Sequence, residues 1–152
     1  MSASPSTPGR LLLTLSAITT TFGGFIADWN HTHVYNPNWP PHAKFHNGQT
    51  MSLGFCLGLS TLYYTWRNSN SNTNISLEKQ KDDLKTAAWL ACMYWVTQLS
   101  AACYPGSLPV DPEFGDGFPQ AWICAGEFVV VGLGVALEWR RLGRVKREGK
   151  RE

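Results

Sequence analysis

Four apolar segments without a single lysine or arginine constrain the fold of this chain more than any other feature. They run over about 11–27, 51–66, 86–104 and 118–139. A helix crosses the hydrocarbon core of a bilayer with about 17–25 residues, so the first two segments are short spans and the fourth is a comfortable one. Glycine, alanine, serine and threonine recur in all four, as they do in closely packed membrane helices. The sequence therefore predicts an all-α fold, an integral membrane four-helix bundle.

The prediction treats the whole chain as one four-span domain, with helices over about 10–28, 41–66, 82–104 and 118–142. A soluble bundle is the alternative, but its helices would need a charged outer face, which these segments lack. A second alternative makes the first segment a signal peptide with Arg10 at its charged end. That interpretation finds no clear cleavage site of small residues before the second segment.

The lysines and arginines predict how the bundle is oriented. If four helices cross the membrane, both termini and the connection between the second and third helices lie on one side. Twelve of the 13 basic residues are then on that side, and only Lys44 is opposite. Because this asymmetry follows the positive-inside rule, we expect both termini in the cytoplasm and the protein in the endoplasmic reticulum membrane. The net charge of +2 is too small to favour nucleic acid as a partner.

The link between the first two segments carries all four histidines, within DWNHTHVYNPNWPPHAKFHNGQ at positions 28–49. Histidine titrates near neutral pH and is the commonest metal ligand in proteins. A proline pair inside this run begins a helix, and helical spacing then places His42, His46 and Gln49 on one face. We expect Asn47 to point away from that face.

Two polar residues lie deeper in the apolar segments. Glu127 is nine residues inside the fourth segment, roughly 13 Å along the helix axis. Gln98 is six residues from the end of the third segment, roughly 9 Å by the same rise. An ionisable side chain at this depth usually faces the bundle interior and has a partner. Asp28 ends the first helix on the same side, so all these groups belong to one membrane leaflet.

We predict an acid–base site in that leaflet. Its catalytic residues are Asp28, His42, His46 and Glu127, and its substrate-binding residues are Asn30, His33, Trp39, Gln49 and Gln98. Each also has a structural interpretation: a hydrogen bond between helices for the glutamate, a helix end tied to the loop for the aspartate, and contact with water or headgroups for the histidines. The convergence of several such residues favours a site over these separate interpretations.

The HxxxH spacing also suits a metal ion. Two histidines one turn apart ligate zinc or iron when a third ligand completes the site, and Asp28, His33 or Glu127 would supply it. Four histidines are too few for the membrane di-iron hydroxylases and desaturases, which share this spacing. A single metal ion stays an alternative, and we expect acid–base chemistry without a metal or cofactor.

The run NPNWPPHAKFHNGQTMSLG at 36–54, followed by YPG at 104–106 and DPEFG at 111–115, resembles a fungal family of small multi-pass membrane proteins. The resemblance covers about 23–138, and NPxWPPHAKFHxGQ is its most specific part. It implies membrane location and fungal origin, some members lying beside natural-product genes, but no catalytic assignment. In general plan the chain is also similar to emopamil-binding-type isomerases and to fungal meroterpenoid cyclases, whose acidic residues protonate an alkene or an epoxide. The chain shares no sequence motif with them, so the similarity is an analogy only.

Two functions follow from these expectations. The first is a membrane-embedded acid/base enzyme that hydrolyses, cyclises or isomerises a lipophilic intermediate of fungal secondary metabolism. The alternative is a non-catalytic lipid- or sterol-binding protein, or a scaffold for pathway enzymes. The expected partners are a lipophilic small molecule and the bilayer, with a homodimer or pathway enzymes left open. An enzyme predicts that His42, His46 and Glu127 meet around a lipid-sized void, whereas a scaffold predicts a filled bundle.

Overall fold

The chain folds into a bundle of α-helices in a computed structural model that describes residues 6–68 and 75–148. Within those ranges there are four α-helices and no strand, so the predicted all-α, four-helix architecture is confirmed. The elements are α1 (Pro8–Asp28), α2 (Pro41–Trp66), α3 (Leu77–Ser100), the short 3-10 helix η1 (Ala101–Cys103) and α4 (Pro119–Glu148). The last two basic residues of the orientation argument, Lys150 and Arg151, lie outside the described residues.

Proline and hydroxyl caps explain where the helices begin. Proline occupies the first turn of α1 and of α2, where its missing N–H leaves no hydrogen bond unmade. The Thr7 hydroxyl accepts a hydrogen bond from the backbone of Arg10 at 3.4 Å, and the Ser76 hydroxyl accepts one from Lys79 at 3.3 Å. The Ser76 cap starts α3 at Leu77, earlier than predicted, because its charged first turns are helical although they are not apolar.

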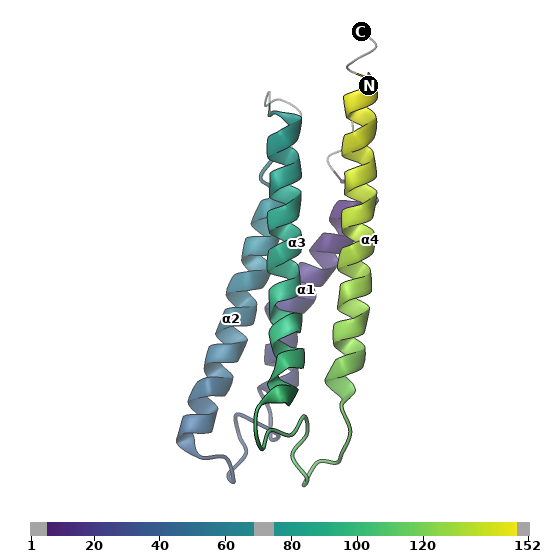
Figure 1. Cartoon of the computed structure of the whole chain (residues 1–152). Coiled ribbons are helices and arrows are strands. Elements are labelled where there is room, and N and C mark those ends of the chain that lie inside the picture. Colours follow the sequence, from purple (N-terminus) through teal and green to yellow (C-terminus); the bar gives the residue numbers. More distant parts are fainter. Residues whose placement is uncertain (1–5, 69–74, 149–152) are drawn as a thin grey trace.

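The helices form a ring in which each packs against its chain neighbours and α4 closes onto α1. α1 also touches α3 across the ring, whereas α2 and α4 make no contact in the described part of the chain. Figure 1 shows the 29–40 and 101–118 links at one end of the bundle and both termini at the other. The histidine-rich link and the acidic link therefore share an end, and most basic residues lie at the opposite end.

The bundle buries several polar side chains and exposes many large apolar ones. α1 buries Ser16, Thr20 and Thr21, and the two threonine hydroxyls donate to backbone carbonyls one turn back at 2.9 and 2.7 Å. Large apolar side chains are exposed along all four helices: Leu11, Leu15, Ile18, Phe22 and Ile26 on α1, Leu53, Phe55 and Leu59 on α2, Trp89 and Val96 on α3, and Trp122, Val129 and Leu133 on α4. An exposed apolar surface this extensive marks contact with an apolar medium or partner.

Two glycines one turn apart bring α2 against α1. A Cβ at Gly58 would lie 2.0 Å from the Thr21 hydroxyl oxygen and 2.6 Å from the Ala17 carbonyl oxygen. A Cβ at Gly54 would lie 3.0 Å from the Thr20 carbonyl oxygen. Such a pair, spaced as in GxxxG, lets two helix backbones approach closely in membrane bundles.

Two of the four described helices meet the length and composition of a membrane span, namely α1 and the Pro119–Arg144 part of α4. α2 and α3 each begin with polar turns, which lower their apolar character at one end. The structure thus supports membrane association through two helices.

Candidate functional site

Asp28 is the centre of a polar cluster at the loop end of the bundle. Its Oδ2 atom accepts a hydrogen bond from Asn47 Nδ2 of α2 at 2.7 Å, and its Oδ1 atom lies 3.8 Å from His33 Nδ1. The Tyr94 hydroxyl of α3 lies 3.3 Å from where a Cβ would stand on Gly24, one turn before Asp28. The Asp28 carboxylate therefore meets Asn47 of α2 and lies near His33 of the first link, whose Nδ1 atom is 2.6 Å from the Thr32 hydroxyl oxygen.

The 29–40 link owes its shape to its own polar side chains. Asn30 closes a turn: its Nδ2 donates to the Ala27 carbonyl at 2.7 Å, and its Oδ1 accepts from the Thr32 backbone N–H at 2.7 Å. The His33 ring stands edge-on to Trp39, with 4.7 Å between ring centroids. The predicted substrate residue Asn30 thus shapes the link, and the predicted substrate residue Trp39 packs against His33.

Hydrogen bonds join the acidic link 101–118 to the histidine-rich link 29–40. Glu113 accepts hydrogen bonds from Asn36 Nδ2 at 2.7 Å and from Asn38 Nδ2 at 3.1 Å, and Asp111 accepts one from Trp39 Nε1 at 2.8 Å. Asn36 is fully buried by these contacts. The sequence analysis did not predict these contacts, although the three acids of the 101–118 link, which has no basic residue, were a signal that it would bind donors.

The structure places His42, His46 and Gln49 on the outer surface of α2. They share a face, as the spacing predicts: the two histidine Nε2 atoms are 3.1 Å apart, and His46 Nδ1 is 3.4 Å from Gln49 Oε1. That face is exposed, whereas Asn47 belongs to the buried face with Met51. As expected, Asn47 points away from the face of His42, His46 and Gln49. The glycine contact with α1 turns the Asn47 face inward, so the predicted site face is the outer one.

Glu127 is buried in the middle of the bundle, far from the histidines. Its carboxyl lies beside the Ser16 and Thr19 hydroxyls of α1, and its Oε2 atom has no hydrogen-bond partner among the described residues. Thr19 and Ser16 precede Asp28 by nine and 12 residues, which corresponds to about 14–18 Å along α1. Glu127 and Asp28 thus cannot act on the same atom. The exposed histidines of α2 do not meet Glu127 either, because α2 and α4 make no described contact.

A hollow of about 160 Å³ lies where α3 ends and α4 begins. Gln98, a predicted site residue, lines it together with Gln120 of α4, which our sequence reasoning missed. Gln120 Nε2 donates to the Pro109 carbonyl at 2.8 Å, while the Oε1 atoms of both glutamines are buried and have no partner in the described chain. A glutamine in the first turn of the last apolar segment was the available signal.

The metal interpretation needs a third ligand near the HxxxH pair. No group of three or more His, Cys, Asp or Glu side chains is placed to hold a metal ion within residues 6–68 and 75–148. Asp28, His33 and Glu127, the three ligands considered for that role, lie inside the bundle or at its rim, while the pair faces outward.

A protein-family model matches most of the chain. The family model of DUF6640, a family of unknown function, matches residues 12–149. The chain belongs to the DUF6640 family. No curated protein and no solved structure matches it. The matched region of this DUF6640 chain contains α2, α3, α4, all of α1 after its first turn and every candidate site residue, so the cluster at Asp28 lies within the family domain.

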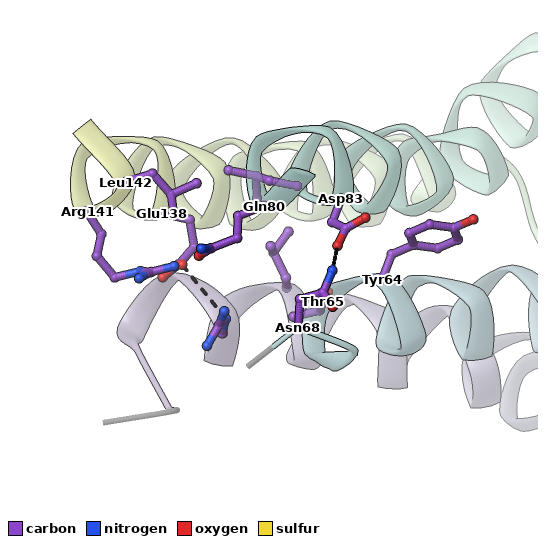
Figure 2. Close-up of a pocket in the computed structure, with 11 residues that line it drawn as sticks. Tyr64, Thr65, Asn68, Gln80, Asp83, Glu138, Arg141 and Leu142 are labelled. Atoms are coloured by element: carbon purple, nitrogen blue, oxygen red, sulfur yellow. Dashed lines mark hydrogen bonds and ion pairs between the residues drawn. The ribbon is translucent and has the colours of Figure 1, made fainter. Parts of the chain in front are cut away.

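The opposite end of the DUF6640 bundle is closed by buried ion pairs. Glu138 accepts hydrogen bonds from Thr7 and, at 2.8 Å, from Arg141, and its Oε2 atom is 3.9 Å from Arg10. Arg10, Glu138 and Arg141 line a hollow of about 30 Å³, and Figure 2 shows Glu138 and Arg141 on one side of it and Asp83 on the other. That volume holds about one water molecule. We therefore interpret this end as a cluster of ion pairs that holds the helix ends together.

Asp83 forms a second ion pair at this end of the bundle. Its carboxylate accepts hydrogen bonds from Arg67 and Asn68, which lie just after α2. The hydrogen bond that the Arg67 guanidinium donates to Asp83 raises the pKa of that guanidinium above its ordinary value. The end of α2 is thereby tied to the start of α3 on the side of the termini.

Proposed function

We propose that this DUF6640 protein spans a membrane four times, in the endoplasmic reticulum, with both termini in the cytoplasm. The apolar exposed surface on all four helices supports this proposal, since lipid is the medium that such a surface favours. The buried threonines satisfy their hydroxyls within the helix, which suits a bundle without access to water. The basic residues at the end that holds the termini support the orientation.

Single-cysteine labelling tests this topology. In a cysteine-free variant inside sealed microsomes, a membrane-impermeant maleimide added outside should label Lys79→Cys, before the apolar part of α3. It should not label His31→Cys, in the first link, until detergent opens the vesicles. Equal labelling of both positions in intact vesicles would contradict the proposal.

We propose further that the protein is an acid/base enzyme acting on a lipophilic intermediate of fungal natural-product synthesis. The observation that carries this proposal is the Asp28–His33 pair, with Asn47 donating to the same carboxylate. In its protonated form Asp28 would donate its proton to an epoxide oxygen or alkene. His33 would then accept one proton, either from the resulting cation or from the water that attacks it. A positioned acid–base group contributes about 10²–10⁴ in rate. We assign the histidine role to His33 instead of His42 and His46, because those two face outward.

The distance between Glu127 and Asp28 decides which carboxyl donates the proton. Glu127 is too far along α1 to share a reacting atom with Asp28, so we assign proton donation to Asp28. The reaction class that suits one carboxyl and one imidazole is ring opening, cyclisation or isomerisation. No redox step is required for any of these.

Coexpression with the neighbouring biosynthetic enzymes tests the activity. Lipid-soluble products are compared by mass with the wild type, Asp28→Asn and His33→Ala, and with His31→Ala as the matched histidine control. Asn at position 28 still accepts the hydrogen bond from Asn47, so the variant removes the acid and keeps the fold. A product that depends on the wild type and on both residues supports the proposal, and one that persists in Asp28→Asn rejects it.

A second function is favoured by the small size of the two hollows described above. The two hollows, of about 30 and 160 Å³, are smaller than the 300–1,000 Å³ typical of ligand pockets. The exposed His42 and His46 also suit a contact surface for lipid headgroups, for a second copy of the chain or for pathway enzymes. This candidate is a non-catalytic lipid- or sterol-binding protein or scaffold. It predicts identical products for the wild type and Asp28→Asn, with loss of product only when the whole chain is deleted.

A further inference from the structure

Two imidazoles on the first turns of α2 face each other across a short gap. His42 and His46 are four residues apart, so helical periodicity places them one above the other on the same face. Their Nε2 atoms are 3.1 Å apart, and the ring planes stand at 75° with 4.5 Å between the centroids. Both side chains are exposed, so a solute reaches the pair directly from the surroundings of the bundle.

The contact with Gln49 determines which nitrogen of His46 is free. His46 Nδ1 lies 3.4 Å from the Gln49 Oε1 atom. An amide oxygen only accepts hydrogen bonds, so this contact requires a proton on Nδ1, and Nε2 of the neutral ring then carries a lone pair. A metal-binding histidine has the same arrangement, in which one ring nitrogen donates to an oxygen and the other ligates the ion.

The distance between the two Nε2 atoms suits a shared transition-metal ion. Imidazole nitrogens bind zinc at about 2.0–2.1 Å. Two nitrogens 3.1 Å apart, each at that distance from one ion, subtend an angle of about 95–102° at the ion. This angle lies between about 90° for tetragonal copper or nickel and about 109° for tetrahedral zinc. The pair can therefore chelate one such ion without rearrangement of the helix.

The chain offers this ion two ligands, and the other coordination positions face outward. Among the residues that the structure describes, no third His, Cys, Asp or Glu side chain joins the pair. Water or another small ligand therefore takes the other positions. Imidazole nitrogen suits copper, nickel and zinc, whereas magnesium and calcium take oxygen ligands. The affinity should follow the general order of the divalent ions, with Cu²⁺ above Ni²⁺ and Zn²⁺.

We propose that His42 and His46 form a surface site for one divalent transition-metal ion. The site is separate from the Asp28 cluster. Asn47, which donates to Asp28, belongs to the buried face of α2, whereas the two histidines belong to the exposed face. The proposal therefore does not rest on the acid/base function, and metal binding and turnover are tested independently.

Isothermal titration of Ni²⁺ into the full chain in detergent micelles, without a histidine tag, tests the site. The exposed thiols of Cys56 and Cys103 are first blocked with N-ethylmaleimide, because thiolates also bind transition metals. We expect one Ni²⁺ per chain and no binding of Mg²⁺. His42→Ala and His46→Ala should each lower the Ni²⁺ affinity about 100-fold, because the second imidazole of a pair binds within the same molecule.

His31→Ala is the matched control, because His31 is also exposed but lies in the 29–40 link, and it should leave the Ni²⁺ affinity unchanged. Electron paramagnetic resonance of bound Cu²⁺ gives a second measurement and should show two nitrogen ligands in the wild type. If the wild type binds Ni²⁺ no more tightly than His42→Ala, or if His31→Ala weakens binding equally, the two rings form a hydrogen-bonded pair only and the proposal is overturned.

Discussion

Replacing Gly58 by alanine should destabilise the bundle, although the same change normally stabilises a helix. Gly→Ala in a helix interior is favourable by about 0.8–1.0 kcal/mol. At this position, however, the new Cβ would lie 2.0 Å from the Thr21 hydroxyl oxygen, 2.6 Å from the Ala17 carbonyl oxygen and 2.8 Å from the Thr21 backbone nitrogen. Two of these are backbone atoms, which cannot rotate away, so α1 and α2 must separate.

The magnitude follows from a matched control on the same helix. A Cβ at Gly48 meets no atom within 4 Å, so Gly48→Ala gains the helix propensity without a clash. Because both variants share that gain, their difference in unfolding free energy isolates the cost of overpacking, about 1–3 kcal/mol. Gly54→Ala should fall between them, since its nearest neighbour, the Thr20 carbonyl oxygen, would be 3.0 Å away.

The assay is reversible unfolding in mixed micelles with increasing SDS, followed by helical circular dichroism. Gly58→Ala should unfold at lower SDS than the wild type, and Gly48→Ala at equal or higher SDS. If the two variants are stabilised equally, the close approach of α1 and α2 is wrong, and with it the assignment of the Asn47 face to the interior.

Three further predictions test other parts of the structure. Glu127→Gln should keep membrane insertion and change turnover in coexpression by less than about tenfold, and complete loss would transfer the acid role from Asp28 to Glu127. Asp83→Asn should lower the unfolding free energy by about 1.5–3 kcal/mol in the same SDS titration. Its neighbour Asp82 is 71% exposed in its ion pair with Lys85, so Asp82→Asn should lower it by less than about 1 kcal/mol. Equal losses would contradict the buried ion pair of Asp83 with Arg67. Glu113→Ala should speed proteolysis of the 101–118 link, with Asp116→Ala as control, and unchanged cleavage would argue against the hydrogen bonds between the two links.

Local chemistry determined the helices. The bounds of α2, Pro41–Trp66, match those expected from the sequence, because a proline start and a long apolar run act within a few turns of chain. The segregation of basic residues at one end is also visible in the sequence, since an antiparallel bundle sends every second link to the same side. The shared face of His42 and His46 follows from helical periodicity alone.

The tertiary structure alone decided which face is inside and which groups meet. Periodicity assigns His42 and His46 to one face and Asn47 to another, but only the contact of Gly58 with α1 turns the asparagine inward. Likewise, Glu113 and Asn36 meet across 77 residues of sequence, and no local pattern encodes that distance. The site depends on such long-range contacts because burial is a property of the packed helices together, whereas helix formation depends on residues a turn or two apart.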